Sequence, residues 1–162
     1  MKRGFTKSWR SELSCLLWSM PPMYHRVFYW LRQKAKWQLE LVPTDRGPGI
    51  WLDPGMLITS YQIIAEGVAY SEMGLLRVPS KKTVGKVLQW LKTNELIELI
   101  TSRFGTTIKI ANWDKYQSAR YETLPAKTNA DSSKRKRRKT DPYAHLYIEE
   151  VNTHEEVPHA GG

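Results

Sequence analysis

The sequence predicts an α+β domain in which several helices precede a β-hairpin. Three stretches carry this prediction. Residues 79–92 have helical periodicity, residues 96–111 hold two β-rich runs around a turn, and residues 123–140 are polar, small and basic. A chain of 162 residues has room for one hydrophobic core. We therefore expect an N-terminal arm or short helix (1–20), a folded domain (21–117) and a basic, mostly disordered tail (118–162).

The first part of the chain is predicted to be helical. Residues 8–20 place apolar side chains at helical spacing, which predicts a short helix that ends at the following pair of prolines. The same spacing returns over residues 23–37 and predicts the first long helix. Residues 39–42 are a candidate short strand, whereas the composition of residues 45–49 (DRGPG) predicts a loop.

A second, shorter helix is expected in the middle of the chain. A proline-glycine turn comes before a candidate strand at residues 56–58. Thr59 and Gln62 have the spacing of a capping box, and the helix that they would start ends near Gly67. Residues 68–79 then form a connection longer than the roughly 3–4 residues of an ordinary helix-turn-helix turn. The connection is expected to hold an extra loop or strand-like segment.

The clearest helix of the sequence lies in residues 79–92 (PSKKTVGKVLQWLK). Ser80 has the place of an N-cap, because its hydroxyl can accept a bond from a free backbone N–H of the first turn. An apolar stripe that must face the core is formed by Val84, Val87, Leu88 and Leu91. The opposite face carries Lys82, Lys86 and Gln89, with Gly85 beside them, where it would allow close approach to a groove. Trp90 lies at the edge of the stripe and is a candidate for a protein interface.

A β-hairpin is expected after this helix. Residues 96–100 and 107–111 are rich in strand-forming side chains, and Gly105 at the turn between them tolerates a positive φ. Beyond the hairpin, Trp113 and Tyr116 are expected to pack back on the domain. Helix, short strand, helix, a helix with a basic face and then a hairpin is the element order of a winged helix-turn-helix. The alternative is any small α+β domain that ends in a hairpin.

Three stretches of the chain also resemble a known family. They are LDPGMLITSYQIIAEG (52–67), VPSKKTVGKVLQWLKTNELIEL (78–99) and GTTIKIANWDKYQ (105–117), and they are similar to the N-terminal winged-helix domain of phage replication-initiation proteins and DnaD-like primosome proteins. The resemblance spans about residues 9–117. It implies that this domain binds origin DNA or self-associates, while a C-terminal helical domain of the longer members contacts DNA and the helicase-loading machinery. Only 45 residues follow Gln117 in the sequence, so we expect no full second domain, and DNA binding and self-association are the roles that carry over from the resemblance.

Charge and composition narrow the functional classes. The formal net charge of +9 favours nucleic acid or an anionic membrane surface as partner. No stretch approaches the roughly 20 apolar residues that span a bilayer, and the N-terminus has no signal-peptide pattern, so we expect a cytoplasmic protein without a membrane partner. The single cysteine and four scattered histidines give no metal-ligand spacing. Since nucleophile, phosphate-loop and paired-carboxylate motifs are also missing, we expect no cofactor and no enzymatic activity.

The candidate DNA-binding residues lie on the basic helix, at the hairpin tip and in the tail. On the helix, Lys82, Lys86 and Gln89 suit the major groove, because lysine can donate to phosphate or guanine and glutamine can pair with adenine. At the helix start, Lys81 and the backbone N–H groups of Ser80 and Lys81 can hold a phosphate. Arg103 at the hairpin tip is the candidate wing residue. The tail residues form one basic run: Lys134, Arg135, Lys136, Arg137, Arg138 and Lys139.

Each candidate site has an ordinary alternative. The basic helix face also fits a solvated surface, and the hairpin arginine an ordinary loop residue. The basic run binds polyanions without sequence preference, and in a eukaryotic chain it would also fit a nuclear localisation signal. Three functions follow as hypotheses. They are a duplex-DNA-binding protein of phage replication initiation, a transcriptional regulator with the same fold, and a self-associating interaction module with loose DNA affinity from its tail.

Overall fold

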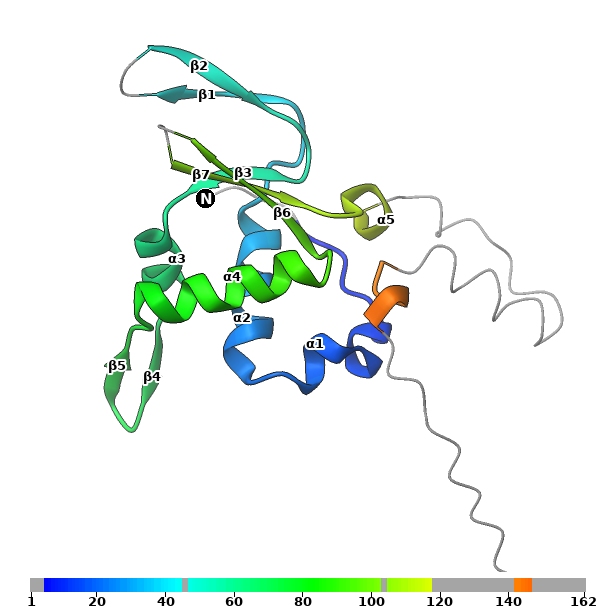
Figure 1. Cartoon of the computed structure of the whole chain (residues 1–162), viewed down its shortest axis with the longest axis vertical. Helices are drawn as coiled ribbons and strands as arrows, with labels where there is room; N and C mark the ends of the chain where they lie inside the picture. Colours follow the sequence, from blue (N-terminus) through cyan, green and yellow to red (C-terminus); the bar gives the residue numbers. More distant parts are fainter. Residues whose placement is uncertain (1–4, 45–46, 103–104, 118–141, 147–162) are drawn as a thin grey trace, which may run out of the picture.

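The computed structural model describes residues 5–44, 47–102, 105–117 and 142–146. Over these residues the chain forms an α+β fold with several helices and three small antiparallel sheets (Figure 1). One sheet has three strands and lies against the helices, and two β-hairpins project from the body. No helix in this described part of the chain has both the length and the apolar composition to cross a bilayer.

The N-terminal region folds into two short helical turns and one long helix. A 3-10 turn, η1 (Arg10–Ser14), leads into α1 (Leu16–Ser19), and α2 (Pro22–Lys34) follows with its proline in the first turn. The single short helix expected over residues 8–20 is therefore broken in two. The long helix also ends earlier than its apolar spacing predicts, because Ala35 has an extended backbone with ψ of 145°.

The central sheet joins strands from distant parts of the sequence. Its order is β3 (Met56–Thr59), β7 (Gly105–Ile110) and β6 (Ile97–Ser102), with Leu57 opposite Ile108 and Leu99 opposite Ile108 on the other side. The short helix α3 (Tyr61–Gly67) follows β3. Its N-cap is Ser60, whose hydroxyl accepts a bond from the Ile63 N–H at 3.2 Å. The expected cap at Thr59 is wrong by one residue, because Thr59 is the buried last residue of β3.

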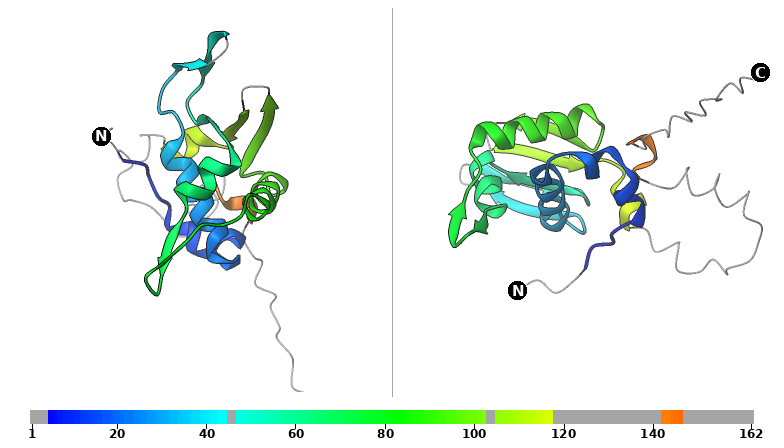
Figure 2. Two further views of the ribbon diagram at one scale, coloured as in Figure 1. Left: turned by 90° about the vertical axis from the view of Figure 1, so that its left-hand side faces the viewer. Right: turned by 90° about the horizontal axis from the view of Figure 1, so that it is seen from below.

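Two hairpins stand out from the body at opposite ends, as Figure 2 shows. The first joins β1 (Glu40–Thr44) to β2 (Gly47–Leu52), so part of the expected DRGPG loop is strand. The composition of this segment predicted a loop, because proline cannot donate a hydrogen bond to a neighbouring strand. In a two-stranded ribbon each strand has one edge without a partner strand, so Pro48 and the glycines are tolerated there. The second hairpin joins β4 (Tyr70–Glu72) to β5 (Leu75–Arg77) and fills the expected long connection between helices.

Helix α4 (Lys81–Thr93) runs across the core and lies beside α2 and α3 (Figure 1). Its four predicted stripe residues, Val84, Val87, Leu88 and Leu91, are all buried. They share one hydrophobic cluster with α2, α3 and the inner face of the sheet. The stripe therefore fixes which face of α4 turns outward.

The end of the described chain also packs on this core. Helix α5 (Trp113–Gln117) buries Trp113 and Tyr116, as expected. The 3-10 turn η3 (Ala144–Leu146) follows Tyr143, and both Tyr143 and Leu146 are buried in the same hydrophobic cluster. Both residues belong to the predicted tail, within residues 143–151, whose apolar side chains are enough to predict a fragment of order there. The folded part of the chain thus does not end at Gln117.

Candidate nucleic-acid interface

The outer face of α4 carries the predicted helix candidates. Lys82, Lys86 and Gln89 are all exposed, and they lie opposite the buried stripe. Lys81 is exposed at the first helical position. Within the described residues, none of these four side chains has a hydrogen-bond or ion-pair partner. Three cations and one amide are thus brought together on one helix and are available to an external ligand.

The start of α4 is capped in the predicted way. The Ser80 hydroxyl accepts a bond from the Thr83 N–H at 3.1 Å and contacts the Thr83 hydroxyl at 2.9 Å. The Ser80 side chain is therefore used within the helix. The N–H groups of Lys81 and Lys82 have no carbonyl one turn earlier within α4, and they remain the groups that an anion at the helix start would meet.

Gly85 serves the packing of two helices. A Cβ at Gly85 would lie 3.3 Å from Cε2 of Tyr61, on α3. The glycine is half-buried, so it lies at the boundary of the polar face. Its lack of a side chain lets α3 and α4 approach each other, which differs from the expected role of clearing a path to a groove.

Trp90 also has a packing role within the domain. Its ring meets the ring of Tyr24, on α2, in an edge-to-face contact with a centroid distance of 5.4 Å and an interplanar angle of 90°. Trp90 is half-buried and packs against the core cluster. Trp90 thus takes part in the contact between α2 and α4. Its place at the edge of the apolar stripe had made it a candidate for a protein interface.

The other predicted site residues lie outside the described residues. Arg103 falls between Ser102 and Gly105, the ends of β6 and β7. The basic run from Lys134 to Lys139 falls between α5 and the 3-10 turn η3. The structure therefore brings Ser80, Lys81, Lys82, Lys86 and Gln89 together, and it does not place the wing or tail candidates.

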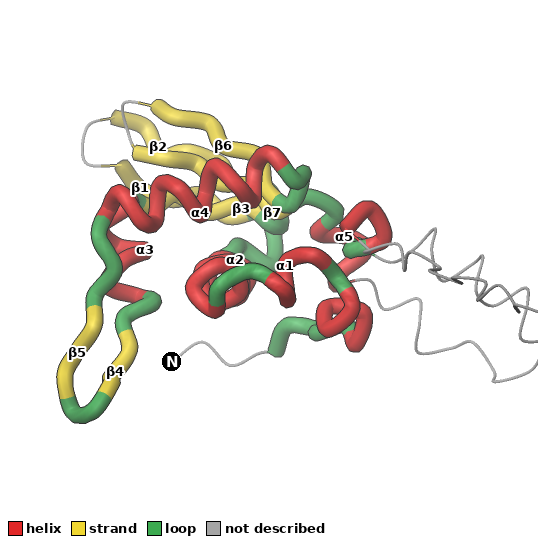
Figure 3. Tube along the Cα trace, turned by 60° about the horizontal axis from the view of Figure 1, so that its bottom comes forward, coloured by secondary structure: helices red, strands yellow, loops and turns green. Residues whose placement is uncertain are grey.

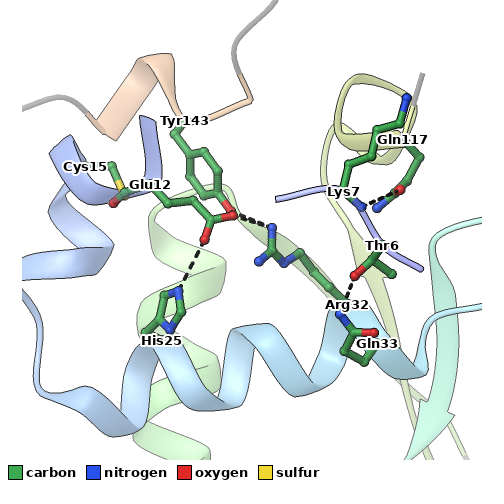
Figure 4. A network of polar contacts seen from close by, with 9 residues as sticks. All are labelled: Thr6, Lys7, Glu12, Cys15, His25, Arg32, Gln33, Gln117 and Tyr143. Carbon is green, nitrogen blue, oxygen red and sulfur yellow. Dashed lines mark hydrogen bonds and ion pairs between the residues drawn. The ribbon is translucent and has the colours of Figure 1, made fainter. Parts of the chain in front are cut away.

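A buried polar network beside α2 was not predicted (Figure 4). The Arg32 guanidinium donates from Nη1 to Glu12 Oε1 at 2.5 Å and to the Tyr143 hydroxyl at 2.8 Å. The Tyr143 hydroxyl in turn donates to Glu12 Oε1, and His25 Nε2 lies 3.3 Å from Glu12 Oε2. Both Glu12 and Arg32 are buried. The sequence held one signal for it: Arg32 follows Phe28 by four residues and so occupies the apolar face of α2.

Glu12 and Arg32 both stay charged in this buried network. Burial raises the pKa of the Glu12 carboxyl, but the hydrogen bond from His25, the charge of Arg32 and the hydrogen bond from Tyr143 together outweigh burial and lower that pKa to about 2. Burial lowers the pKa of Arg32, whereas its interactions with Tyr143 and Glu12 raise it to a net higher value. Burial also raises the pKa of Tyr143, so its hydroxyl stays a donor. The carboxylate of Glu12, Nη1 of Arg32 and the Tyr143 hydroxyl satisfy one another, whereas Arg32 Nε is buried without a hydrogen-bond partner among the described residues. The network serves the fold.

Comparison with protein-family models, curated proteins and solved structures gave no match. The function of the chain therefore has to be argued from its own residues. In the part of the chain that the structure describes, no group of three or more His, Cys, Asp or Glu side chains is arranged to hold a metal ion. Among the described residues, α4 gathers on its outer face and first turn four polar side chains that have no hydrogen-bond or ion-pair partner.

Proposed function

We propose that the chain is a duplex-DNA-binding protein of the phage replication-initiation type, which reads DNA with a winged helix-turn-helix. The observation that carries the proposal is the outer face of α4. It presents Lys82, Lys86 and Gln89 without partners among the described residues, on a helix whose other face is buried. Lysine neutralises phosphate and can donate to guanine, and glutamine pairs with adenine.

The arrangement around α4 supports this proposal. In a winged helix-turn-helix, a bracing helix precedes the reading helix, and a hairpin follows to reach the neighbouring backbone or minor groove. Here α3, α4 and the β6–β7 hairpin come in that order, and β3 pairs with β7 to hold the hairpin on the domain. The role in replication rests on the family resemblance of the sequence. Self-association and contact with a helicase-loading partner remain expectations of that resemblance.

The double variant Lys86→Ala with Gln89→Ala tests the reading helix. Both side chains are exposed, so the variant is expected to fold, and removing each base contact should cost about 1–3 kcal/mol in discrimination. Binding to a duplex selected by the wild-type chain should fall toward the affinity for random duplex. Both DNAs are titrated with both proteins at one salt concentration, since affinity for DNA depends steeply on salt.

A matched control removes the same groups elsewhere. Lys115→Ala with Gln38→Ala deletes one exposed lysine and one exposed glutamine outside α4, and it should keep the ratio of selected to random affinity. A folded Lys86/Gln89 variant that also keeps the full ratio would show that α4 is not the reading helix. Footprinting on the parent genome separates the replication role from transcriptional regulation, because a protected origin supports the first and a protected promoter the second.

The basic run is expected to add affinity without specificity. Replacing Lys134–Lys139 by alanines, rather than deleting the tail, keeps Tyr143 in the core. Affinity should then fall alike for every duplex, and the slope of log affinity against log salt should flatten by roughly one unit for each phosphate that is no longer neutralised. The test measures the slope of log affinity against log salt for the wild type and for the variant, on selected and on random DNA. If this variant loses all DNA binding, the third hypothesis, an interaction module with loose tail affinity, replaces the proposal.

A further inference from the structure

Helix α4 is basic along its whole length and contains no acidic residue. Its four lysines run from the first helical position to the last turn: Lys81, Lys82, Lys86 and Lys92. All four are exposed, and none has an ion-pair partner among the described residues. Because Lys82 and Lys86 are four residues apart on one helix, their like charges repel each other. A negatively charged partner on this face would relieve the repulsion.

The outer side of α4 is open to such a partner. In Figure 3 the helix lies on the outside of the body, and no described helix or strand crosses over it. The side chains of Lys82, Lys86 and Gln89 are exposed on this side, opposite the buried stripe. An extended segment of chain can therefore lie along the helix without displacing any described element.

The last described residues of the chain, 142–146, are attached at the C-terminal end of α4. His145 donates from Nε2 to the carbonyl oxygen of Asn94, the C-cap of α4, at 2.8 Å. Tyr143 and Leu146, on either side of His145, are buried in the core cluster. In Figures 1 and 2 the orange turn η3 lies beside this end of α4. The chain that follows Leu146 therefore starts at one end of the basic helix.

The residues that follow Leu146 are acidic. Residues 147–157, here called the acidic segment, contain no lysine or arginine and four glutamates: Glu149, Glu150, Glu155 and Glu156. They belong to a chain whose formal net charge is +9. The acidic segment lies outside the described residues. Its opposite charge makes α4 the favoured surface at the place where the described chain ends.

The acidic segment is long enough to cover α4. The 13 residues of the helix span about 20 Å at about 1.5 Å per residue. An extended chain spans about 3.3 Å per residue, so Glu149 can lie up to about 10 Å from Leu146, within reach of Lys92 in the last turn. Glu156 can lie up to about 33 Å from Leu146, which exceeds the length of the helix and reaches its first turn.

We propose that the acidic segment binds the outer face of α4 and competes there with DNA. The inference rests on the proposed DNA binding of α4 and adds its regulation. The glutamate carboxylates take the places of phosphates, with the first pair beside Lys92 and the second pair beside Lys82 at the helix start, where the helix dipole favours negative charge. Because the segment belongs to the same chain, its effective concentration at α4 is high.

Such a contact weakens DNA binding without blocking it. Exposed ion pairs are individually weak and are screened by salt, whereas a duplex carries one negative charge for about every 1.7 Å of its axis and can displace the segment. The segment has to leave α4 before any duplex binds there. It therefore lowers the affinity for selected and for random DNA by the same factor and leaves their ratio unchanged.

The first test detects the contact without DNA. In the full chain, all four glutamates of the acidic segment are replaced by glutamine. At low salt the NMR amide shifts of Lys82, Lys86 and Gln89 should differ between the wild type and this variant. The shifts should converge at about 1 M salt, where the Debye length is about 3 Å.

A charge-matched control neutralises four exposed carboxylates elsewhere in the chain. It carries the changes Asp53→Asn, Glu72→Gln, Glu98→Gln and Asp114→Asn, none of which lies on α4 or next to it in the sequence. Its net charge equals that of the four-glutamine variant, but its amide shifts on α4 should stay those of the wild type. The comparison separates a contact with the acidic segment from a general change in charge.

The second test measures DNA affinity with the same three proteins. At low salt the four-glutamine variant should bind both selected and random duplex about three- to tenfold more tightly than the charge-matched control. The gain should be equal for the two DNAs and should shrink as salt is added. Shifts on α4 without any gain in DNA affinity would leave the contact standing and contradict the proposed DNA binding of α4.

Three results would overturn the contact itself. The first is equal amide shifts on α4 in the wild type and the four-glutamine variant at low salt. The second is shift differences that occur at Lys134–Lys139 instead, because the acidic segment then binds the basic run. The third is differences that grow with protein concentration, because the segment then binds α4 of a second copy. A gain that differs between selected and random DNA would overturn simple competition.

Discussion

Glu12→Ala is expected to lower the free energy of unfolding by about 3–5 kcal/mol, because it leaves the buried Arg32 guanidinium without its counter-charge. The substitution also removes the acceptor of the Tyr143 hydroxyl and a partner of His25. Denaturant melts of both proteins measure the difference. Coulomb attraction alone would not give so large an effect, since most of the loss is the cost of an uncompensated buried charge.

Two controls separate this mechanism from a general loss of a carboxylate. Glu98→Ala breaks an exposed ion pair with Lys109 at 3.8 Å, and it should cost less than about 1 kcal/mol. Replacing both Glu12 and Arg32 by methionine removes the two charges together and should recover much of the stability that Glu12→Ala loses. A single Glu12→Ala change that costs no more than Glu98→Ala would contradict the placement of the network in the core.

The same carboxylate predicts sensitivity to acid. The folded chain holds the pKa of Glu12 at about 2, below its ordinary value of 4.5, so protonation favours the unfolded chain. The stabilisation is complete above about pH 4.5 and is lost as the pH falls toward 2. At about 1.4 kcal/mol per pKa unit, its full size is about 3 kcal/mol. Melts between pH 6 and pH 2.5 should show a smaller acid loss in the Glu12→Gln variant than in the wild type.

Leu88→Ala is expected to cost about 2–5 kcal/mol of unfolding free energy. Leu88 is fully buried in the middle of the α4 stripe, and its neighbours in the cluster come from the helices and the sheet. Removing its methyl groups leaves a cavity that these elements can fill only in part. Thermal or denaturant unfolding measures the loss.

Gln89, which follows Leu88 in the sequence, supplies the control for this loss of stability. Gln89 is exposed, so Gln89→Ala should change stability by no more than about 0.5 kcal/mol. Equal melting of Leu88→Ala and the wild type would mean that α4 does not turn its apolar stripe to the core. The assignment of Lys82, Lys86 and Gln89 to the outer face would then fail as well, since both faces belong to one helix.

The parts of the fold that the sequence predicted are those that depend on nearby residues. The apolar stripe and serine cap of α4, the β6–β7 hairpin and the packing of Trp113 and Tyr116 all follow from local spacing, and the structure confirms them. The outer face of α4 followed directly, because a buried stripe defines the face opposite to it. Whether that face binds DNA stays a prediction.

The parts that the sequence did not predict depend on distant partners. The β1–β2 hairpin contains Pro48 between two glycines, and only the pairing of Leu41 with Trp51 and its neighbours makes it a ribbon. Glu12 and Arg32 lie 20 residues apart and on separate elements. Spacing rules describe one helix or strand at a time, so they contain no information about such a pair.

The contact of Tyr143 with Glu12 also affects the order in which parts of the domain fold during synthesis. Its hydroxyl meets Glu12 across 131 residues of sequence, a contact that links the two ends of the described structure. Closing so long a loop is entropically costly and slow compared with local pairing. A ribosome delivers the N-terminal residues first, so Glu12 and Arg32 emerge long before Tyr143. The nascent domain can therefore assemble its helices and sheet around an unfinished polar site, which the Tyr143 ring completes only after residue 143 has been synthesised.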